Sequence, residues 1–464
     1  MNSTNKEVRA TEEAQSGVSA EKLGASAGES HFTLWHGVTI ALLMAGYSGY
    51  YFCRSNLSVC LPQMIAEMAS RGVAPDAAKI HFGSIVSFGV LIYAVGKFIS
   101  GSMADMFGGL KNFLGGMAGA ILFTVVFALS GGFPLFTLAW LGNRLFQSAG
   151  WAGLVKVASR WFSYSTYGTV MGVLALSYLF GDAISRYIMS LLLGAGMGWR
   201  GIFLVGAALL TVLLLLCFLF LRETAQERGL PAPIANPLNV YGDKAEEEPE
   251  AHQSLSEILR PLLASPTFWV VCLISLGTTL LRETFNFWTP DYFVEFVGLS
   301  APQAASRSAL FPLFGGLSVL VSGLLSDRLG LNGRNRVLMG GLALSAVCLG
   351  ALAITPHGAN PWLAVSLVAL TGFLMLGPYA FLSGAISLDF GGKRGSATAA
   401  GIIDGVGYLG GYLSGDAVAR VTVYYGWGRA FALLAGIAAL TAAAAFVLVL
   451  RTHKTAPEAE INAA

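Results

Sequence analysis

YLFGDAISR at residues 178–186 recurs as YLSGDAVAR at residues 412–420, with six of the nine positions identical. Three further pairs of segments recur in the same order along the chain: RSNLSVCLP at 54–62 with RETFNFWTP at 282–290, SGSMADMFG at 100–108 with SGLLSDRLG at 322–330, and Gly198-Trp199 with Gly426-Trp427. Positions 54 and 282 differ by 228, and the other pairs have offsets close to this value. The chain is therefore predicted to contain two copies of one unit.

The composition indicates that both units lie in a membrane. The chain has 464 residues, of which 55% are hydrophobic and only 12% are charged, too few charges to cover a soluble surface of this size. Apolar stretches of about 20 residues, the length that crosses a bilayer as a helix, recur along most of the chain. We predict an all-α membrane protein with two pseudo-symmetric bundles of six helices. The twelve expected spans are 35–60, 83–104, 112–131, 133–159, 167–194, 200–221, 267–296, 304–326, 336–355, 361–388, 397–424 and 427–450.

The polar segments divide the chain into five regions: a tail at 1–33, a six-helix bundle at 34–221, a linker at 222–265, a second bundle at 266–451 and a tail at 452–464. The linker is the one long polar segment between spans, and it carries Pro231, Pro233 and Pro237 and an acidic run. Lysine and arginine predominate in the loops on the linker side of the bundles, so both tails and the linker are expected in the cytoplasm. We expect a multi-pass protein of a bacterial inner membrane.

Several function classes are not supported by the residues present. The net charge of +2 argues against a nucleic-acid surface. The five cysteines lie inside apolar runs, without the spacing of a zinc site or a disulfide framework. The chain contains no phosphate-binding glycine loop and no cluster of metal ligands. We therefore expect a monomeric protein that is not an enzyme and has no cofactor, and whose partners are the lipid bilayer and a small anion.

Arginines deep in two spans are the strongest candidates for binding this anion. A charge at the bilayer centre costs between about 3 and about 15 kcal/mol, so each requires a reason. Arg54 shares a helix face with Tyr47 and Tyr50, and Arg282 shares one with Asn286. The repeat places the two arginines opposite each other across the central axis, where planar guanidinium groups suit a tetrahedral oxyanion. The alternative is that each arginine pairs with a buried carboxylate, such as Glu283, Asp291 or Asp404, and only joins helices.

The repeated acid–base pairs lead to a different expectation. Asp182 and Arg186, like Asp416 and Arg420, are four residues apart, so each pair shares one helix face and can neutralise itself. We expect a structural or gating role for both pairs, with proton coupling as the alternative. Asp404 has no local partner in the sequence, which makes it a candidate for a proton site or for a contact to the substrate or to a cavity lysine.

Several motifs resemble those of the major facilitator superfamily. GSMADMFG and GLLSDRLG are similar to its loop motif G-x-x-x-D-R-x-G, with Met106 replacing the usual arginine in the first copy. Within the superfamily, the chain looks most like the organophosphate:phosphate antiporters. The matching features are YYFCRSN with Arg54, YAVGKFISG with Lys97, FQSAGW at 146–151, the stretch from Arg282 to WTPDYF, and GYLGG at 407–411.

The resemblance implies exchange of a phosphorylated organic anion, of the sugar phosphate or glycerol phosphate class, for inorganic phosphate by alternating access. It places Lys97 in the cavity, whereas Lys156 is as well explained by snorkelling to the surface as by substrate contact. The glycerol-3-phosphate antiporter of that family has a histidine on its fifth span, and this chain has none between His81 and His252. Arg144 instead resembles the arginine motif of proton-coupled anion symporters. A proton-coupled symporter of organic carboxylates and a sugar-phosphate sensor therefore remain as alternatives.

Overall fold

The structure, a computed structural model, describes residues 32–233, 255–330 and 332–461, and within these ranges it consists of helices and connecting loops without strands. The first bundle contains α2 (Leu34–Ser70), α3 (Pro75–Phe107), α4 (Gly109–Leu129), α5 (Phe133–Gln147), α6 (Ala149–Ser159), α7 (Tyr164–Gly194) and α8 (Trp199–Phe220). After the short 3₁₀ helix η1 (Ala225–Arg228), the second part contains α9 (Leu255–Ala264), α10 (Pro266–Glu295), α11 (Ala301–Ser308), α12 (Leu310–Arg328), α13 (Gly333–Ile354), α14 (Pro361–Phe381), the π-helical turn η3 (Leu382–Ile386), α15 (Ser387–Leu413) and α16 (Asp416–Ile461).

The prediction of twelve spans in an all-α protein is confirmed. Within the described residues, eight helical segments are long and apolar enough to cross a membrane, and one of them, Thr398–Arg451, contains the last two predicted spans. The three other predicted spans are helical as well and lie on α2, on α5 with α6, and on α7. The last segment is double because α16 reverses direction at Gly426, where the backbone has φ 80° and ψ 167°. Glycine adopts this conformation without the steric penalty that a Cβ would cause.

Prolines and polar caps begin several of these helices. Pro75, Pro266 and Pro361 stand in the first turn of their helices, where a missing N–H costs nothing because that group has no intrahelical acceptor. The Asn360 side chain accepts a hydrogen bond from the Trp362 N–H at 2.9 Å, which satisfies one of the free donors at the start of α14. Helix starts are therefore readable in the sequence.

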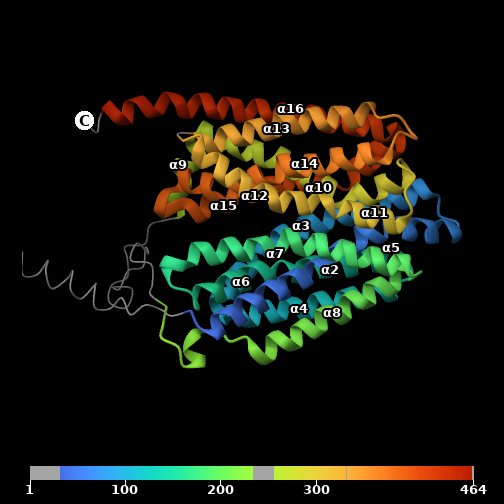
Figure 1. The fold of residues 1–464 in the computed structure, drawn as a ribbon, viewed down its shortest axis with the longest axis horizontal. Coiled ribbons are helices and arrows are strands. Elements are labelled where there is room, and N and C mark those ends of the chain that lie inside the picture. The colour runs from blue at the N-terminus through green and yellow to red at the C-terminus, as the bar shows by residue number, and fades with distance from the viewer. Residues whose placement is uncertain (1–31, 234–254, 331, 462–464) are drawn as a thin grey trace, which may run out of the picture.

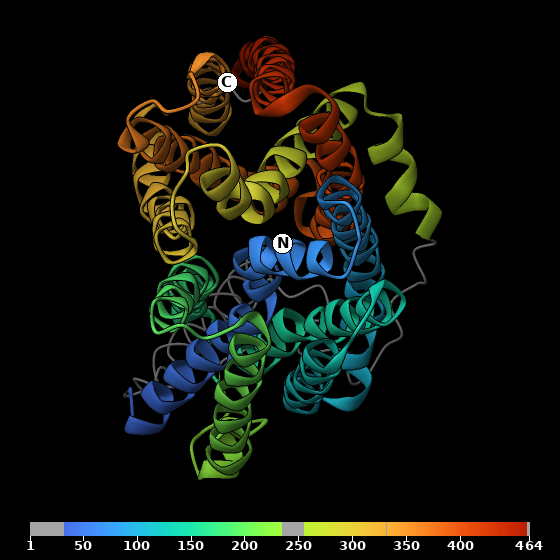
Figure 2. The ribbon, with the colours of Figure 1, turned by 90° about the vertical axis from the view of Figure 1, so that its right-hand side faces the viewer.

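The two bundles lie side by side, with α2 to α8 in one and α10 to α16 in the other (Figure 1). The end at which α9 and the C-terminus lie is called here the linker end, and the other is called the far end. Helices α2, α3 and α7 of the first bundle contact α10, α11, α12, α15 and α16 of the second. Viewed along the helices, the two bundles form two adjoining groups around a central interface (Figure 2).

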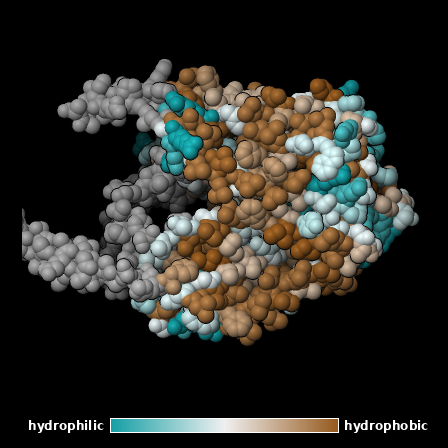
Figure 3. All heavy atoms as spheres, in the orientation of Figure 1, coloured by the Kyte–Doolittle hydropathy of each residue, from teal (hydrophilic) through white to brown (hydrophobic). Residues whose placement is uncertain are grey.

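The face seen in Figure 3 carries a broad apolar belt, with hydrophilic residues towards both ends. Large apolar side chains are exposed on the helices of both bundles, among them Leu122, Leu138, Phe218, Leu324, Val347 and Leu440. Such a surface would be unstable in water but matches the hydrocarbon core of a bilayer. The protein is therefore a multi-pass integral membrane protein.

Most of the first tail (1–33) and the middle of the linker (222–265) lie outside the described ranges. The predicted bundles at 34–221 and 266–451 contain α2 to α8 and α10 to α16. The helix α16 continues to Ile461, so part of the predicted tail at 452–464 is helical.

Candidate functional site

Two connected chambers lie between the bundles. The wide chamber has a volume of about 420 Å³, and the narrow chamber has one of about 70 Å³. Polar lining residues of the wide chamber are Tyr47, Tyr51, Arg54, Tyr93, Lys97, Tyr178, Arg282, Tyr379, Asp404 and Tyr408. Polar lining residues of the narrow chamber include Arg54, Ser55, Ser58, Arg144, Asp182, Arg186, Arg282, Glu283 and Asn286. Five residues line both chambers: Tyr51, Arg54, Tyr178, Arg282 and Tyr379.

Both predicted arginines lie at this junction, one from each bundle. Arg54 projects from α2, and its guanidinium carbon lies 5.2 Å from the Tyr51 ring centre and 4.8 Å from that of Tyr93. Arg282 projects from α10, 4.6 Å from the ring centre of Tyr379. Aromatic rings hold guanidinium groups in place without neutralising them. The two arginines therefore meet at one cavity as the repeat predicts, although they do so in different electrostatic settings.

Arg282 has a carboxylate partner, whereas Arg54 has none among the described residues. Arg282 Nη2 lies 2.6 Å from Oε1 of the neighbouring Glu283, and both side chains are largely buried. This contact agrees with the alternative of a buried carboxylate partner for Arg282. Because Glu283 also lines the narrow chamber, the pair remains within reach of a molecule bound there. An anion at the junction would compete with Glu283 for Arg282.

Lys97 and Asp404 face each other across the two bundles in the wide chamber. Their charged atoms are 3.5 Å apart, and each side chain is about one-third exposed. The Lys97 ammonium lies 5.0 Å from the ring centre of Tyr408 and 5.7 Å from that of Tyr93. Asp404 therefore has the cavity lysine as its partner, one of the contacts considered for it from the sequence.

Arg144 reaches the narrow chamber from the last turn of α5 and is only 4% exposed. Its guanidinium carbon lies 4.7 Å from the Tyr93 ring centre and 5.9 Å from that of Trp140. The symporter alternative uses Arg144 with Asp182 or Asp404. In the structure these carboxylates have other partners, because Asp182 pairs with Arg186 and Asp404 with Lys97.

Of four other predicted site residues, two line a chamber and two do not. Tyr47 lines the wide chamber, and Asn286 lines the narrow one. Tyr50 lines neither, because its hydroxyl is directed at α4, where it donates to the Phe113 carbonyl at 2.6 Å. Lys156 lies outside the lining of both chambers on α6, with its Cβ close to Gly109 of α4. These contacts favour a packing role for Tyr50 and give Lys156 no place at the cavity.

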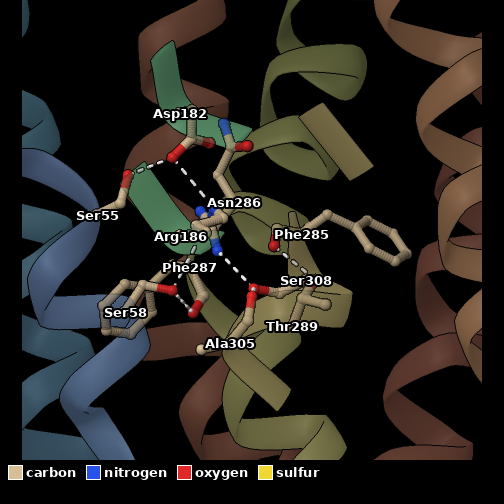
Figure 4. Close-up of polar contacts among 10 residues, drawn as sticks. All are labelled: Ser55, Ser58, Asp182, Arg186, Phe285, Asn286, Phe287, Thr289, Ala305 and Ser308. Atoms are coloured by element: carbon tan, nitrogen blue, oxygen red, sulfur yellow. Dashed lines mark hydrogen bonds and ion pairs between the residues drawn. The ribbon is translucent and has the colours of Figure 1, made fainter. Parts of the chain in front are cut away.

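The first acid–base pair lines the narrow chamber and belongs to a cluster of polar contacts between α2, α7, α10 and α11 (Figure 4). Arg186 Nε donates to Asp182 at 3.0 Å, as the i,i+4 spacing predicts, and Ser55 also donates to this carboxylate. Arg186 then crosses to the other bundle, donating to the Asn286 carbonyl at 2.6 Å and to the Ser308 hydroxyl at 3.3 Å. The Ser58 hydroxyl donates to the Phe287 carbonyl at 2.7 Å. This cluster joins the two bundles.

The second acid–base pair joins the bundles through Asp416, and its arginine takes no part in this connection. Asp416 accepts from the Ser84 hydroxyl of α3 at 2.6 Å, and its own N–H donates to Ser87 Oγ at 2.8 Å. The backbones approach closely, since a Cβ on Gly415 would lie 2.3 Å from the Gly83 carbonyl oxygen. Arg420 binds Asp416 at 2.7 Å but is half-exposed on the outer surface.

Lys79 makes a third connection at the far end. This lysine of α3 is 4% exposed, and its ammonium lies 2.8 Å from Asp291 and in contact with Glu295, both on α10. It also lies 4.6 Å from the ring centre of Trp427. A buried cation held by two carboxylates of the opposite bundle is a strong link, because separating the groups would leave charges unpaired. The far end is therefore closed in this structure.

Sequence reasoning did not identify the aromatic lining formed by Tyr93, Tyr379 and Tyr408. A usable signal exists for two of these residues. Tyr93 precedes Lys97 by four residues, and Tyr408 follows Asp404 by four, so each shares a helix face with a charge already singled out. Tyr93 and Tyr408 meet across the bundles with ring centres 5.8 Å apart.

Comparison with known proteins identifies the family and the fold. Residues 43–415 match the model of the Major Facilitator Superfamily. Two relatives that are 26% identical are a probable hexose phosphate transport protein of Chlamydia muridarum, with 88% of this chain and 89% of the relative covered, and a glycerol-3-phosphate transporter of Bacillus subtilis, with 90% and 92% covered. The membrane sensor protein UhpC of Salmonella typhimurium is also 26% identical, with 89% and 91% covered.

A solved structure has the same fold. The crystal structure of a bacterial homolog of the human lysosomal transporter Spinster, in an inward-facing and occupied conformation, superimposes with a TM-score of 0.72. The alignment covers 91% of this chain and 98% of that one, at 13% sequence identity. At this identity the similarity concerns the fold alone.

Proposed function

The chain belongs to the Major Facilitator Superfamily, and we propose that within it the protein exchanges a phosphorylated organic anion for inorganic phosphate. The observation that carries the proposal is the position of Arg54 and Arg282 at the junction of the two chambers, one from each bundle. A guanidinium group presents parallel donors that match two oxygens of a phosphoryl group. An anion held by both arginines would contact both bundles at once.

The rest of the cavity suits the organic part of such a molecule. Tyrosine hydroxyls from both bundles, including Tyr51, Tyr178 and Tyr379, can donate to or accept from hydroxyl groups of a sugar or of glycerol. A volume of about 420 Å³ falls in the range of small-molecule sites. The similarity to a probable hexose phosphate transport protein and to a glycerol-3-phosphate transporter supports the same substrate class.

Exchange follows from the charges in the empty site. Closing the linker end around unpaired arginines would bury uncompensated positive charge, which is costly in a membrane. A bound anion lowers this cost, so the two bundles can rock past each other only when substrate or phosphate is present. The connections at the far end, made by Arg186, Asp416 and Lys79, would open as the linker end closes.

One further candidate function is favoured by a specific observation. The similarity to a membrane sensor protein covers nearly the whole chain, so binding of a sugar phosphate could serve signalling instead of transport. The two functions differ in whether the bound anion crosses the membrane. Counterflow separates them, because a sensor binds the ligand without accumulating it.

The experiment uses proteoliposomes loaded with inorganic phosphate and supplied with labelled phosphorylated compounds. We expect uptake that requires internal phosphate and does not rise with an inward proton gradient; uptake driven by that gradient would favour the symporter, and binding without uptake would favour the sensor. Arg54→Lys and Arg282→Lys should each abolish most exchange, because lysine lacks the planar fork. Arg307→Lys is the matched control, since Arg307 stacks on Trp362 away from both chambers. Wild-type exchange in both site variants would refute the arginine site.

We further propose that the linker end faces the cytoplasm of a bacterium, with the protein in the inner membrane as a monomer. The excess of lysine and arginine at that end supports this orientation. A cysteine at Gly132 should react with an impermeant thiol reagent added to intact cells, and a cysteine at Gly392 should not. The reverse labelling pattern would invert the orientation.

A further inference from the structure

Arg144 differs from most of the other cations that line the two chambers. Three of these cations have carboxylate partners within 3.5 Å: Arg186 with Asp182, Arg282 with Glu283, and Lys97 with Asp404. Arg54 and Arg144 form no ion pair with any residue in the described ranges. A charge away from water without an ion-pair partner is unfavourable, so an arginine that lines a cavity and forms no ion pair is suited to bind an anion.

The two unpaired arginines are close to each other. Their guanidinium carbons lie 4.8 Å and 4.7 Å from the same Tyr93 ring centre, so the carbons cannot be further apart than the sum of these distances, 9.5 Å. Both side chains line the narrow chamber. Like charges at this range repel each other, and an anion between them removes the repulsion.

The neighbouring helix makes room for Arg144. A Cβ on Gly89 of α3 would lie 2.6 Å from Trp140 Nε1 and 3.2 Å from Arg144 Cγ. Any larger residue at position 89 would displace Trp140 and the Arg144 side chain itself. Arg144 is therefore held in the chamber by its packing on Trp140 and Tyr93, and packing on aromatic rings leaves its hydrogen-bond donors available.

The charges that line the two chambers do not balance. The described lining contains five cations, Arg54, Lys97, Arg144, Arg186 and Arg282, against three carboxylates, Asp182, Glu283 and Asp404. When all are ionised, two positive charges remain, which are those of the unpaired Arg54 and Arg144. A ligand with two negative charges would neutralise the site, and one with a single negative charge would not.

We propose that Arg144 is an anion ligand beside Arg54, and that the pair selects the doubly ionised phosphate monoester over singly charged anions of the same shape. The proposal rests on the proposed function and adds a third arginine and a charge requirement to its site. A phosphate monoester carries nearly two negative charges at pH 7, because its second pKa is about 6. A sulfate monoester has the same tetrahedral shape and a single charge, which makes it the matched probe.

The test compares competition by glucose 6-phosphate and by glucose 6-sulfate against labelled inorganic phosphate in proteoliposomes. Wild-type protein should prefer the phosphate ester strongly. Arg144→Gln removes one surplus charge, so it should lower the ratio of phosphate-ester to sulfate-ester affinity by about tenfold or more. Arg144→Lys should keep most of this ratio while weakening both ligands, because it retains the charge and loses the fork.

The ratio of phosphate-ester to sulfate-ester affinity distinguishes a failure of this inference from a failure of the proposed function. If wild-type protein binds neither inorganic phosphate nor the phosphate ester, the proposed function fails. If wild-type protein binds both and Arg144→Gln keeps the wild-type ratio, Arg144 only packs against Trp140 and Tyr93, and this inference is overturned. A variant that does not fold is replaced by Arg144→Met, whose unbranched side chain fills similar space without charge, and the same ratio decides.

Discussion

The two copies of the GDAxxR motif have the same local geometry and different surroundings. Asp182–Arg186 is buried, with the arginine 2% and the aspartate 7% exposed, and the arginine bonds to the opposite bundle. In Asp416–Arg420 the arginine is 52% exposed, and the contacts to the opposite bundle are made by Asp416. The geometry of an i,i+4 ion pair is determined by the helix, whereas its contribution to stability depends on how far solvent reaches it. Identical motifs therefore have different roles in the two bundles.

A second pair of repeated positions differs in the same way. Glu67 and Glu295 are separated by the repeat offset, and each accepts from a tryptophan indole, Trp199 in the first bundle and Trp427 in the second. Glu67 forms an ion pair within its own bundle, with Arg200 at 2.6 Å. Glu295 takes Lys79 from the opposite bundle. Glu67 therefore stabilises a single bundle, whereas Glu295 links the two bundles.

The largest effect is expected from breaking the buried pair at one member. Asp182→Asn leaves Arg186 buried without its partner, which should cost roughly 3–5 kcal/mol of stability, while Asp182→Asn/Arg186→Gln should recover most of the loss. The measurement is the unfolding midpoint and monodispersity of detergent-extracted protein, with exchange assayed in parallel. Equal damage in the single and double variants would show that the two residues do not act as a pair. A double variant that folds but loses proton-driven accumulation would instead indicate proton coupling.

A smaller effect is expected at the lysine that joins the bundles. Lys79→Met leaves Asp291 buried and unpaired, at a cost of about 2–3 kcal/mol, and Lys79→Met/Asp291→Asn should be milder. Because this link closes the far end, the variant should also expose that end more often. An increased reactivity of a cysteine introduced at Ser58 towards a small thiol reagent would report this opening. Unchanged reactivity together with unchanged stability would contradict the assigned role.

The exposed copy of the motif should be much more tolerant. Asp416→Asn loses the Arg420 contact at the surface, where solvent screens it, and retains an oxygen that can accept from Ser84. Its unfolding midpoint should fall far less than that of Asp182→Asn under the same conditions. Equal losses at the two sites would remove the contrast between the copies.

The smallest effect is expected in the pH dependence of stability, through the contacts of Glu67. The hydrogen bond from Arg200 holds the pKa of Glu67 below its usual value, with Trp199 and Arg71 acting in the same direction. A carboxylate with a lowered pKa stabilises the folded state above its unfolded pKa, and this contribution is lost as pH falls through the folded pKa. When the pH is lowered from 6 to below the ordinary glutamate pKa of about 4.3, Glu67→Gln should therefore lose slightly less stability than the wild-type protein. Parallel thermal melts across that range would test it, and identical slopes would exclude a contribution from Glu67.

Much of the fold could be read from the residues. Apolar length defines a membrane helix because the bilayer offers no water to satisfy the backbone, so spans are local properties of the sequence. The repeat at an offset of 228 then indicated two related bundles and an axis between them. The positions of Arg54 and Arg282 at one cavity followed from that symmetry.

The aromatic and acidic surroundings of the arginines required the assembled bundles. Tyr93 comes from α3, Tyr379 from α14 and Tyr408 from α15, and no local pattern brings these helices together. Tyr50 illustrates the converse, because it follows the helix face of Arg54 in sequence but is rotated towards Phe113 of α4. A helix face is wide enough to serve two neighbours, and the packing decides which residue faces which.

The twelve spans, the two-fold repeat and the i,i+4 pairing within each GDAxxR motif can be read from the sequence, because they depend on residue order, helix geometry and bilayer thickness. The tertiary structure decided which charges are neutralised. It pairs Arg282 with Glu283 and Lys97 with Asp404, and Arg54 and Arg144 form no ion pair within the described residues. Charge compensation falls steeply with distance and rises with burial, and both quantities exist only once the helices are packed.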